Sequence, residues 1–396
     1  MEFQGYKRAD GSVGVRNHVL IVSASNCANE LASMISNGVK GTLALTHNHE
    51  CTRLQPDIER AMRTLVGMGS NPNVAAALVV GLGCDHLSAS EIAEGIAESQ
   101  KPVEVVTIEE TGGFQEALER GTRVARTMVG QVSQEQRQLC DLGHITLGVK
   151  CTGTHTMSAL AGHRAVGRAY DVVIGSGGRA IFSETAELIG AEHIMARRAA
   201  NKEVAQRLYE VVGRMEKCIA AAGVDIRGSQ PTRGNIQGGI TTLEEKSLSA
   251  IVKTGTAPLK GVLEYAENPR GKGLFFMDGT AMTSQLFAGM VAVGAQMLIL
   301  SVGGGLPARF RNLTGYAGWV PVVPVIKVLS NPSDSQESEY FDIYAGSIVE
   351  GKESAEQVGD RLVKEILAIA SGKASRSEMH SAYQEPLELY ATGPLL

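Results

Sequence analysis

The chain has 396 residues, 43% of them hydrophobic and 20% charged, so a folded protein of two or three domains is expected. A formal net charge of −5 gives no basis for binding nucleic acid through bulk electrostatics. The six cysteines are widely spaced and no apolar secretory segment precedes them, which argues against a disulfide framework and for a reducing cytoplasm. The uncharged stretch 279–308 is interrupted by glutamine and glycine, so we expect a buried helix and strand there and no membrane span.

The first part of the chain alternates short β-branched runs with helix-like segments, a pattern typical of a parallel sheet covered by helices. The expected strands are 19–23, 41–45, 76–80 and 103–108, and the expected helices are 28–36, 56–68, 89–99 and 114–128. A polar stretch at 130–139 follows. We therefore predict a Rossmann-like N-terminal domain over residues 1–140 and a C-terminal α/β domain over residues 141–396.

The second part of the chain continues the alternation with longer insertions. The expected strands are 145–149, 171–174, a run ending near 182, 273–277, 296–302 and 322–329. One expected helix begins at 158, and two further helices cover 202–222 and 354–371. The predicted fold class is α/β, with two Rossmann-like parallel-sheet units and an active-site crevice between them.

Four cysteines stand at the ends of four apolar runs, namely Cys27, Cys51, Cys84 and Cys151. Ligands of a parallel sheet bind outside the carboxyl ends of its strands, so four thiols at such ends are expected to converge on one crevice. Thiolates are ligands for iron, zinc or an iron–sulfur cluster. The alternative is that each cysteine is a small buried hydrophobe.

Two histidines alternate with one of these cysteines in the stretch Thr46-His-Asn-His-Glu-Cys51. In an extended segment His47, His49 and Cys51 would share one face. We predict His47 as a metal ligand and His49 as an acid–base group, because imidazole serves both purposes. The alternative is that both rings bond to loop backbone.

A glycine-rich loop at 231–239 precedes a helix-like segment that carries Lys246. Such loops present backbone N–H groups to anions, so Gly234, Asn235, Gly238 and Gly239 are candidate substrate-binding residues. Lys246 is a candidate base, provided that burial lowers its pKa. An ordinary loop and a surface lysine remain the alternative.

Glu184 follows an expected strand and is a candidate acid, base or metal ligand. The competing interpretation is a glutamate that caps the following helix. The nearby glycines at 175–178 do not complete a dinucleotide-binding fingerprint, which disfavours an NAD-dependent oxidoreductase.

Several motifs resemble the catalytic region of the altronate and galactarate dehydratase family, which includes the large subunit of (2R)-sulfolactate sulfo-lyase. They are residues 5–17, 79–84, 231–239, 240–248, 322–327 and 342–346. The resemblance implies an iron-supported lyase that acts on a 2-hydroxy acid, and the four cysteines and His47 fall on positions that the family also uses. Because the chain begins directly at the large-region motif, the resemblance also implies a separate small subunit.

The chain departs from the family pattern in two places. The family's Cys-Gly-Gly-Ser-Asp stretch is replaced at 151–164, and its Thr-Gly-Arg-Gly-Thr is replaced at 302–306. Residues gained in or next to these stretches are His155, His163, Arg164, Arg309 and Arg311. Arginine binds carboxylates and sulfonates through paired hydrogen bonds, so a small anionic substrate is expected, with His155 and Arg164 as binding residues. Solvated arginines on a rearranged loop are the alternative.

We therefore predict a metal-dependent lyase of the dehydratase type that makes a 2-oxo acid. Iron, as Fe²⁺ or an iron–sulfur cluster, or else zinc, would bind the substrate and stabilise the enolate. His49 or Lys246 would take the C2 proton, Arg16, Asn17 and the 231–239 loop would position the anion, and water or sulfite would leave from C3. A homo-oligomer is expected. The alternative from another class is a non-catalytic binding subunit.

Overall fold

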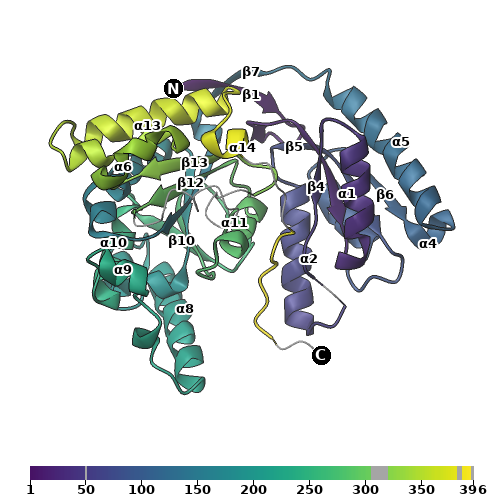
Figure 1. The fold of residues 1–396 in the computed structure, drawn as a ribbon. Coiled ribbons are helices and arrows are strands. Elements are labelled where there is room, and N and C mark those ends of the chain that lie inside the picture. Colours follow the sequence, from purple (N-terminus) through teal and green to yellow (C-terminus); the bar gives the residue numbers. More distant parts are fainter. Residues whose placement is uncertain (50, 305–319, 381–385, 394–396) are drawn as a thin grey trace.

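The computed structural model describes residues 1–49, 51–304, 320–380 and 386–393 (Figure 1). They form two all-parallel sheets with helices between and around them, which confirms the predicted α/β class with parallel-sheet units. The first sheet has the order β4-β3-β5-β6. Its strands are β3 (His18–Ser23), β4 (Thr42–Leu45), β5 (Val74–Gly81) and β6 (Val103–Thr107).

The second sheet has the order β10-β11-β9-β8-β12-β13-β14. Its strands are β8 (Thr146–Thr152), β9 (Arg179–Phe182), β10 (Leu259–Leu263), β11 (Gly273–Met277), β12 (Met297–Val302), β13 (Val325–Leu329) and β14 (Ile343–Tyr344). A short antiparallel sheet of β1 (Glu2–Lys7), β2 (Val13–Gly14) and β7 (Gln138–Asp141) links the two parts of the chain, and the predicted boundary near residue 140 falls inside β7.

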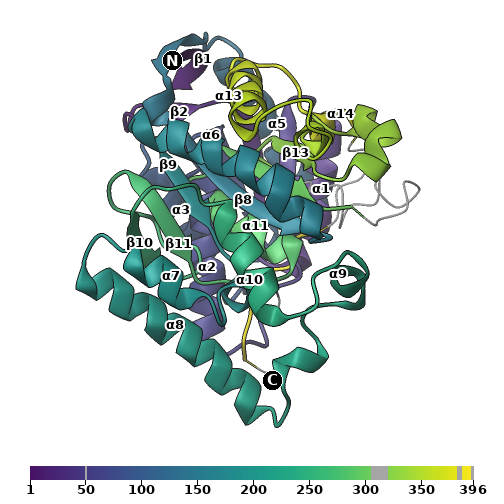
Figure 2. The ribbon, with the colours of Figure 1, turned by 90° about the vertical axis from the view of Figure 1, so that its left-hand side faces the viewer.

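Helices separate and cover the two sheets in layers. Two helices cover each face of the four-stranded sheet. One face packs against α1 (Asn29–Gly38) and α5 (Phe114–Val132), and the other packs against α2 (Gln55–Gly69) and α3 (Ala89–Ala97). The seven-stranded sheet lies between α11 (Thr283–Ala292) and an outer layer (Figure 2). That layer contains α6 (His163–Gly175), α8 (Lys202–Ala221), α10 (Leu243–Val252) and α13 (Ala355–Ala370).

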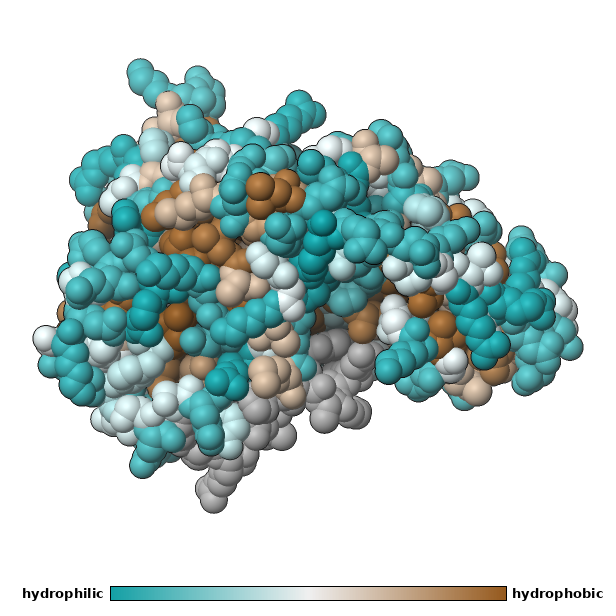
Figure 3. Space-filling model, turned by 90° about the horizontal axis from the view of Figure 1, so that it is seen from above, coloured by the Kyte–Doolittle hydropathy of each residue, from teal (hydrophilic) through white to brown (hydrophobic). Residues whose placement is uncertain are grey.

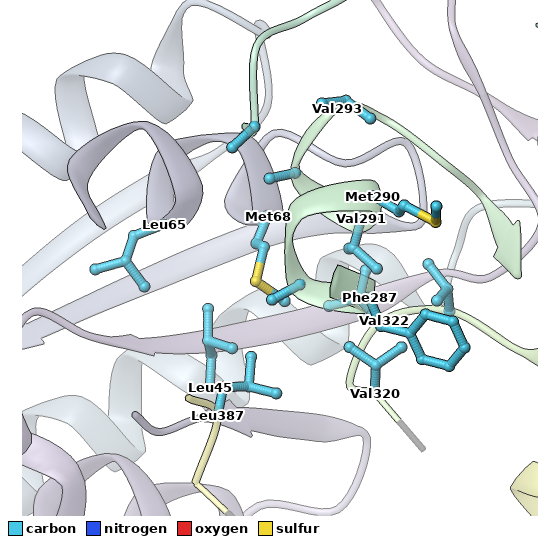
Figure 4. Packing of buried hydrophobic residues seen from close by; sticks show 14 of the residues in the cluster. Leu45, Leu65, Met68, Phe287, Met290, Val291, Val293, Val320, Val322 and Leu387 are labelled. Carbon is cyan, nitrogen blue, oxygen red and sulfur yellow. The ribbon is translucent and has the colours of Figure 1, made fainter. Parts of the chain in front are cut away.

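One apolar cluster joins the inner faces of both sheets. Leu45, Leu65 and Met68 come from the first unit and pack with Phe287 and Val291 of α11 (Figure 4). Gly67 allows α2 and α11 to approach closely, because a Cβ there would overlap the carbonyl oxygen of Ala292. The two units therefore share part of one core.

Three buried amide side chains join the amino ends of the two sheets. Asn73 accepts from Val15 N–H (2.8 Å) and donates to the carbonyls of Gln296 (2.9 Å) and Val322 (3.0 Å). Asn71 caps the end of α11 by donating to the carbonyls of residues 291 and 295. The Gln296 side chain donates to the carbonyls of Val13 (2.6 Å) and His144 (2.9 Å). Because Asn73 precedes β5 and Gln296 precedes β12, the central strands of both sheets start at one junction and their carboxyl ends point away from it.

The C-terminal segment 386–393 returns to the first unit, and in Figure 1 it runs in yellow beside α2. Leu387 N–H donates to the Thr46 carbonyl (2.8 Å), and Asn48 N–H donates to the Leu387 carbonyl (3.1 Å). At its far end, Gly393 N–H donates to Asp57 near the start of α2 (2.8 Å). This segment thus fixes the backbone of the loop that carries His47.

One predicted element is wrong. Residues 171–174 were expected as a strand, but they form the last turn of α6, whose buried residues Val166, Ala169, Tyr170 and Val173 repeat at helical spacing. Of the β-branched run Val172–Ile174, only Val173 is buried, as expected for a helix, and packing overrides local propensity. The pattern also missed the short strands β1, β2, β7, β10 and β14.

The face of the molecule drawn in Figure 3 is mainly hydrophilic, and hydrophobic residues are interspersed on it. Among the described helices, none has the length and apolar character needed to cross a bilayer. The stretch around α11 and β12 is buried between the sheets, as predicted.

We predict that Asn73→Ala lowers the free energy of unfolding by about 3 kcal/mol, because it leaves several buried backbone groups without partners. Urea denaturation measures the effect. Asn37→Ala, at an exposed position in α1, is the matched control and is expected to change stability by less than about 0.5 kcal/mol. Equal stability of the two variants would contradict a structural role for the junction.

Candidate functional site

The carboxyl edges of the two sheets are where ligands of such folds bind, at the point where strand order reverses. This point lies between β3 and β5 in the first sheet and between β8 and β12 in the second. Cys27 and Cys84 follow β3 and β5, and Cys151 lies near the end of β8. Both reversal points therefore carry predicted cysteines.

Hydrogen bonds hold together the three loops at the edge of the four-stranded sheet. Asn26 N–H donates to the His49 carbonyl (3.0 Å), the His86 ring contacts the Cys51 carbonyl (3.0 Å), and the Ser25 hydroxyl bonds to Asp85. The loops therefore form one structure, and their cysteines, Cys27, Cys51 and Cys84, are all exposed.

Cys151 lies apart from these three in the second unit. It is buried, its sulfur lies 3.2 Å from a Glu187 carboxylate oxygen, and the Lys253 ammonium donates to it at 3.2 Å. Within the described ranges, no three His, Cys, Asp or Glu side chains are grouped so that they could hold a metal ion. The predicted five-residue ligand set therefore does not fit a single metal site in this arrangement.

His47 has both ring nitrogens engaged by backbone. Its Nδ1 accepts from His49 N–H (3.2 Å), so Nε2 carries the proton and donates to the Ser23 carbonyl (2.8 Å). Burial lowers the pKa of His47 to about 4, which leaves the ring neutral. These contacts agree with the alternative that the His47 ring bonds to loop backbone, and they leave neither ring nitrogen free to bind a metal. His49 is buried on the same loop, in the first unit.

The main charged cluster lies at the carboxyl edge of β8 and β9, and we call it the lysine–glutamate cluster. It consists of Lys150, Cys151, Glu184, Glu187, Lys246 and Lys253, all buried. Lys150 donates to Glu184 (2.7 Å) and Lys253 to Glu187 (2.7 Å). Lys246 lies 3.6 Å from each of the two carboxylates. The structure thus brings the predicted residues Glu184 and Lys246 together.

The lysine–glutamate cluster shifts the pKa values of Glu187, Lys253 and Cys151. Burial opposes ionisation of Glu187, but the ammonium groups, Lys253 first, outweigh it and hold the carboxyl pKa well below its usual range. Burial likewise opposes the charge on Lys253, yet Cys151 and Glu187 raise its pKa above the ordinary value. Burial and then Glu187 raise the pKa of the Cys151 thiol, which therefore stays protonated at neutral pH.

Formal charges in the lysine–glutamate cluster do not cancel. Three ammonium groups face two carboxylates and a neutral thiol, which leaves one positive charge in excess. A buried uncompensated charge is costly in a protein interior. The cluster is therefore suited to receive an anion.

Two local distortions accompany the lysine–glutamate cluster. Glu184 has a φ of 81°, in the left-handed region that a glutamate seldom adopts. The chain after β8 enters α6 through a π-helical turn, Ser158–Gly162, a feature frequent at functional sites. Strain of this kind is typical of sites where the fold fixes a side chain against its own preference.

The prediction that burial makes Lys246 a base is wrong. Burial lowers its pKa, but Glu187 and Glu184 outweigh that effect and raise the pKa above the ordinary value. Lys246 is therefore an ammonium ion at neutral pH, with Gln230 as a further acceptor (2.9 Å). It can bind or stabilise an anion, but it cannot accept a proton.

Arg16 and Asn17, predicted to bind substrate, serve as structural anchors instead. Arg16 makes a two-pronged contact with Glu378 (2.8 and 2.7 Å) and also donates to the carbonyls of Val15, Ile369 and Lys373. Asn17 bonds to Arg8 and to the Val132 carbonyl. With their hydrogen-bonding groups engaged, neither is available to a ligand.

The predicted 231–239 loop packs against the loop after β8. Asn235 uses its amide to cap α9 (Arg233–Gln237) and to donate to the Thr154 carbonyl (3.0 Å). Gly238 lies against the His155 ring, since a Cβ there would be 2.7 Å from it, and Gly239 has a φ of 87°. Gly234 lies within α9. Asn235 is therefore structural, whereas His155 is half-buried beside the predicted loop.

Arg164 is exposed on α6 and influences Glu356 in the first turn of α13. This position agrees with the alternative that Arg164 is a solvated surface arginine. Arg309 and Arg311 lie outside the described residues.

The sequence reasoning missed Lys150, Glu187 and Lys253. Signals for them were present, because Lys150 interrupts a buried apolar strand and Lys253 follows Lys246 by two helical turns. His163 belongs to the same region, and its Nδ1 donates to the Ser249 carbonyl (2.8 Å). Burial and then Lys253 lower its pKa to about 4, so the ring is neutral.

We predict that Lys253→Met lowers the free energy of unfolding by about 3–5 kcal/mol, because it leaves the buried Glu187 carboxylate without its 2.7 Å partner. The double variant with Glu187→Leu should recover much of this loss. Lys217→Met, on the exposed side of α8, is the control. Unchanged stability of Lys253→Met in chemical denaturation would contradict the pairing.

Comparison with known proteins identifies the family. The model described as D-galactarate/altronate dehydratase, C-terminal, matches residues 142–392. The model described as D-galactarate dehydratase/altronate hydrolase, second domain, matches residues 5–133.

Individual relatives agree with the family models. The chain is 35% identical over 381 residues to a Chromohalobacter salexigens protein named (2R)-sulfolactate sulfo-lyase subunit beta, covering 95% of this chain and 94% of the relative. It is 30% identical to galactarate dehydratase (L-threo-forming) of Escherichia coli, covering 94% and 73%. It is 27% identical to altronate dehydratase of Bacillus subtilis, covering 95% and 75%. The chain belongs to the D-galactarate/altronate dehydratase family.

Proposed function

We propose that this protein is a lyase that removes the C2 proton of a small anionic 2-hydroxy acid and expels the group on C3. The observation that carries the proposal is the excess positive charge of the lysine–glutamate cluster at a sheet edge where such folds bind ligands. The names of the relatives, two dehydratases and a sulfo-lyase, describe eliminations from hydroxy acids and support the same reaction class.

The reaction balances without a redox step. The C2–H bond breaks and its proton passes to a base, while its electron pair forms the C2=C3 double bond. The C3 substituent leaves with the electrons of its own bond, as sulfite or, with a proton, as water. The resulting enol ketonises to a 2-oxo acid.

The lysine–glutamate cluster supplies the electrostatic part of this reaction. Loss of the C2 proton places further negative charge next to a carboxylate, and fixed ammonium groups stabilise that charge better than reorganising water does. Lys246 lies 3.6 Å from each carboxylate, whereas Lys150 and Lys253 are each held at 2.7 Å by one of them, and it keeps its proton, so we assign it to the substrate anion. His155, beside the loop after β8, stays a candidate binding residue, and His49 stays a candidate base.

Sulfolactate is the second, more specific candidate substrate. The sulfo-lyase subunit is 35% identical to this chain, against 27–30% for the dehydratases. A sulfonate substrate is doubly charged, and departing sulfite is more highly charged than water, so an excess of buried ammonium groups favours this substrate over an uncharged polyol chain. The name of that relative also supports a second subunit as a partner. A homo-oligomer and a cytoplasmic location stay predictions.

An iron cofactor stays a prediction, and the geometry of the described residues does not support it. The five predicted ligands do not form one group among the described residues, and no step of the reaction above passes through a metal. Cys27, Cys51 and Cys84 remain the candidates with exposed thiols on joined loops.

We predict that the full-length chain, purified anaerobically, forms 2-oxo acid from at least one of sulfolactate, altronate and galactarate. Lys246→Met should lower kcat/KM about 100-fold, the cost of losing one donor to a developing anion. Lys217→Met, which removes an exposed ammonium from α8, is the control. Ligand binding without any product, and without a second subunit that restores turnover, would support the non-catalytic alternative.

A separate prediction concerns metal. Cys84→Ser should lower the iron and sulfide content of the anaerobically purified protein, whereas Cys218→Ser, at an exposed cysteine of α8, should not. Cys151→Ser should also leave the metal content unchanged, because its sulfur is held by Glu187 and Lys253. Full activity in a metal-free preparation would defeat the metal requirement.

A further inference from the structure

One buried lysine of the seven-stranded sheet stands outside every ion pair. Lys327, in the middle of β13, is only 4% exposed. Within the part of the chain that the structure describes, its ammonium group has no hydrogen bond and no carboxylate partner, in contrast to Lys150, Lys246 and Lys253. A buried charge without a partner is expensive, so this residue requires an explanation.

Strand register places Lys327 level with Lys150, one member of the lysine–glutamate cluster. Leu300 of β12 pairs with Lys150 of β8 on one side and with Lys327 of β13 on the other. Residues opposite one another in register share a face of the sheet, and the Cα atoms of the two lysines are therefore about 10 Å apart, two strand spacings. Two long side chains on one face at this separation can contact the same small acid.

The face they share is the inner one. Alternate residues of β13, Val325 and Leu329, belong to the apolar cluster that joins the two sheets, as do Leu298, Leu300 and Val302 of β12. Lys327 lies between them on the same side of its strand. It therefore lies on the face turned toward α11 and the first unit.

Among the described residues, the charged groups around β13 do not neutralise Lys327. The carboxylate of Asp342, before β14, accepts hydrogen bonds from the backbone N–H groups of Lys327 (2.7 Å) and Arg376 (2.8 Å). On α14 (Arg376–His380), Glu378 is paired with Arg16. In the 3-10 segment Pro332–Tyr340, Asp334 acts on His155. Burial outweighs the influence of Asp342 and lowers the pKa of Lys327.

We propose that Lys327 is the base that takes the C2 proton in the elimination. The inference rests on the proposed function and goes beyond it by naming the proton acceptor. In its unprotonated form the Lys327 amine takes the proton and becomes an ammonium ion, the C–H electron pair forms the C2=C3 bond, and the C3 group leaves with its own electron pair. Lys246 and Lys253 cannot act this way, because their carboxylate partners keep them protonated.

The first experiment needs no substrate. Lys327→Met removes a buried amino group without a partner among the described residues and replaces it with an apolar side chain of similar length, so the urea midpoint should stay the same or rise. Lys253→Met, which breaks a buried ion pair, should lower the midpoint and serves as the comparison. A clear loss of stability in Lys327→Met would show a structural role and overturn the assignment.

The second experiment uses the acid that the wild-type chain converts. Lys327→Met and Lys327→Arg should both lower kcat at least about 100-fold with little change in KM, because arginine keeps the charge but cannot give up its proton. In the wild type, kcat/KM should rise with pH as the amine loses its proton, and this rise should disappear in both variants. Exchange of the C2 hydrogen with solvent should be lost as well.

Each result decides one question. Activity retained in Lys327→Arg would make Lys327 an anion-binding cation and overturn its role as base. Loss of the pH-dependent rise in His49→Gln, with Lys327→Met unaffected, would assign the base to His49 instead. A wild-type chain that converts none of the acids would defeat the proposed function itself, and with it the reaction that Lys327 is assigned to serve.

Discussion

The amide junction of Asn71, Asn73 and Gln296 is the constraint on which the rest of the structure depends. Buried amides without partners would be strongly destabilising, so these side chains fix the backbone groups around them in one arrangement. That arrangement starts the central strands of both sheets from one point. The carboxyl edges of both sheets, with the loops after β3, β5 and β8, therefore lie away from the junction. Ligands of such sheets bind at these edges.

The second sheet combines this geometry with an unusual set of charges. Three lysines and two glutamates are buried together, and their pairing raises the pKa of Lys246 and Lys253 and lowers that of Glu187. An unbalanced buried charge lowers the stability of the fold, and a bound anion would compensate it. Family membership indicates a lyase, and the excess positive charge of the cluster is suited to an anionic substrate.

The corrected predictions share a physical cause. Arg16, Asn17 and Asn235 were chosen because their side chains can bind anions, but tertiary contacts use those same groups to hold helix ends and strand starts. Lys246 was expected to lose its proton on burial, yet two nearby carboxylates reverse the effect. A residue's chemistry is read from sequence, whereas its partners come from distant parts of the chain.

The sequence by itself determined the α/β class, most of the strands and long helices, and the family, because hydrophobic periodicity and local motifs are properties of short segments. It also placed Glu184 and Lys246 among the candidate residues. Only the tertiary structure decided that Cys151 belongs with Glu187 and Lys253 and not with the other cysteines. It alone showed that Lys327 is level with Lys150. The reason is that strand order and register bring together residues more than a hundred positions apart, and no local pattern records which of them will meet.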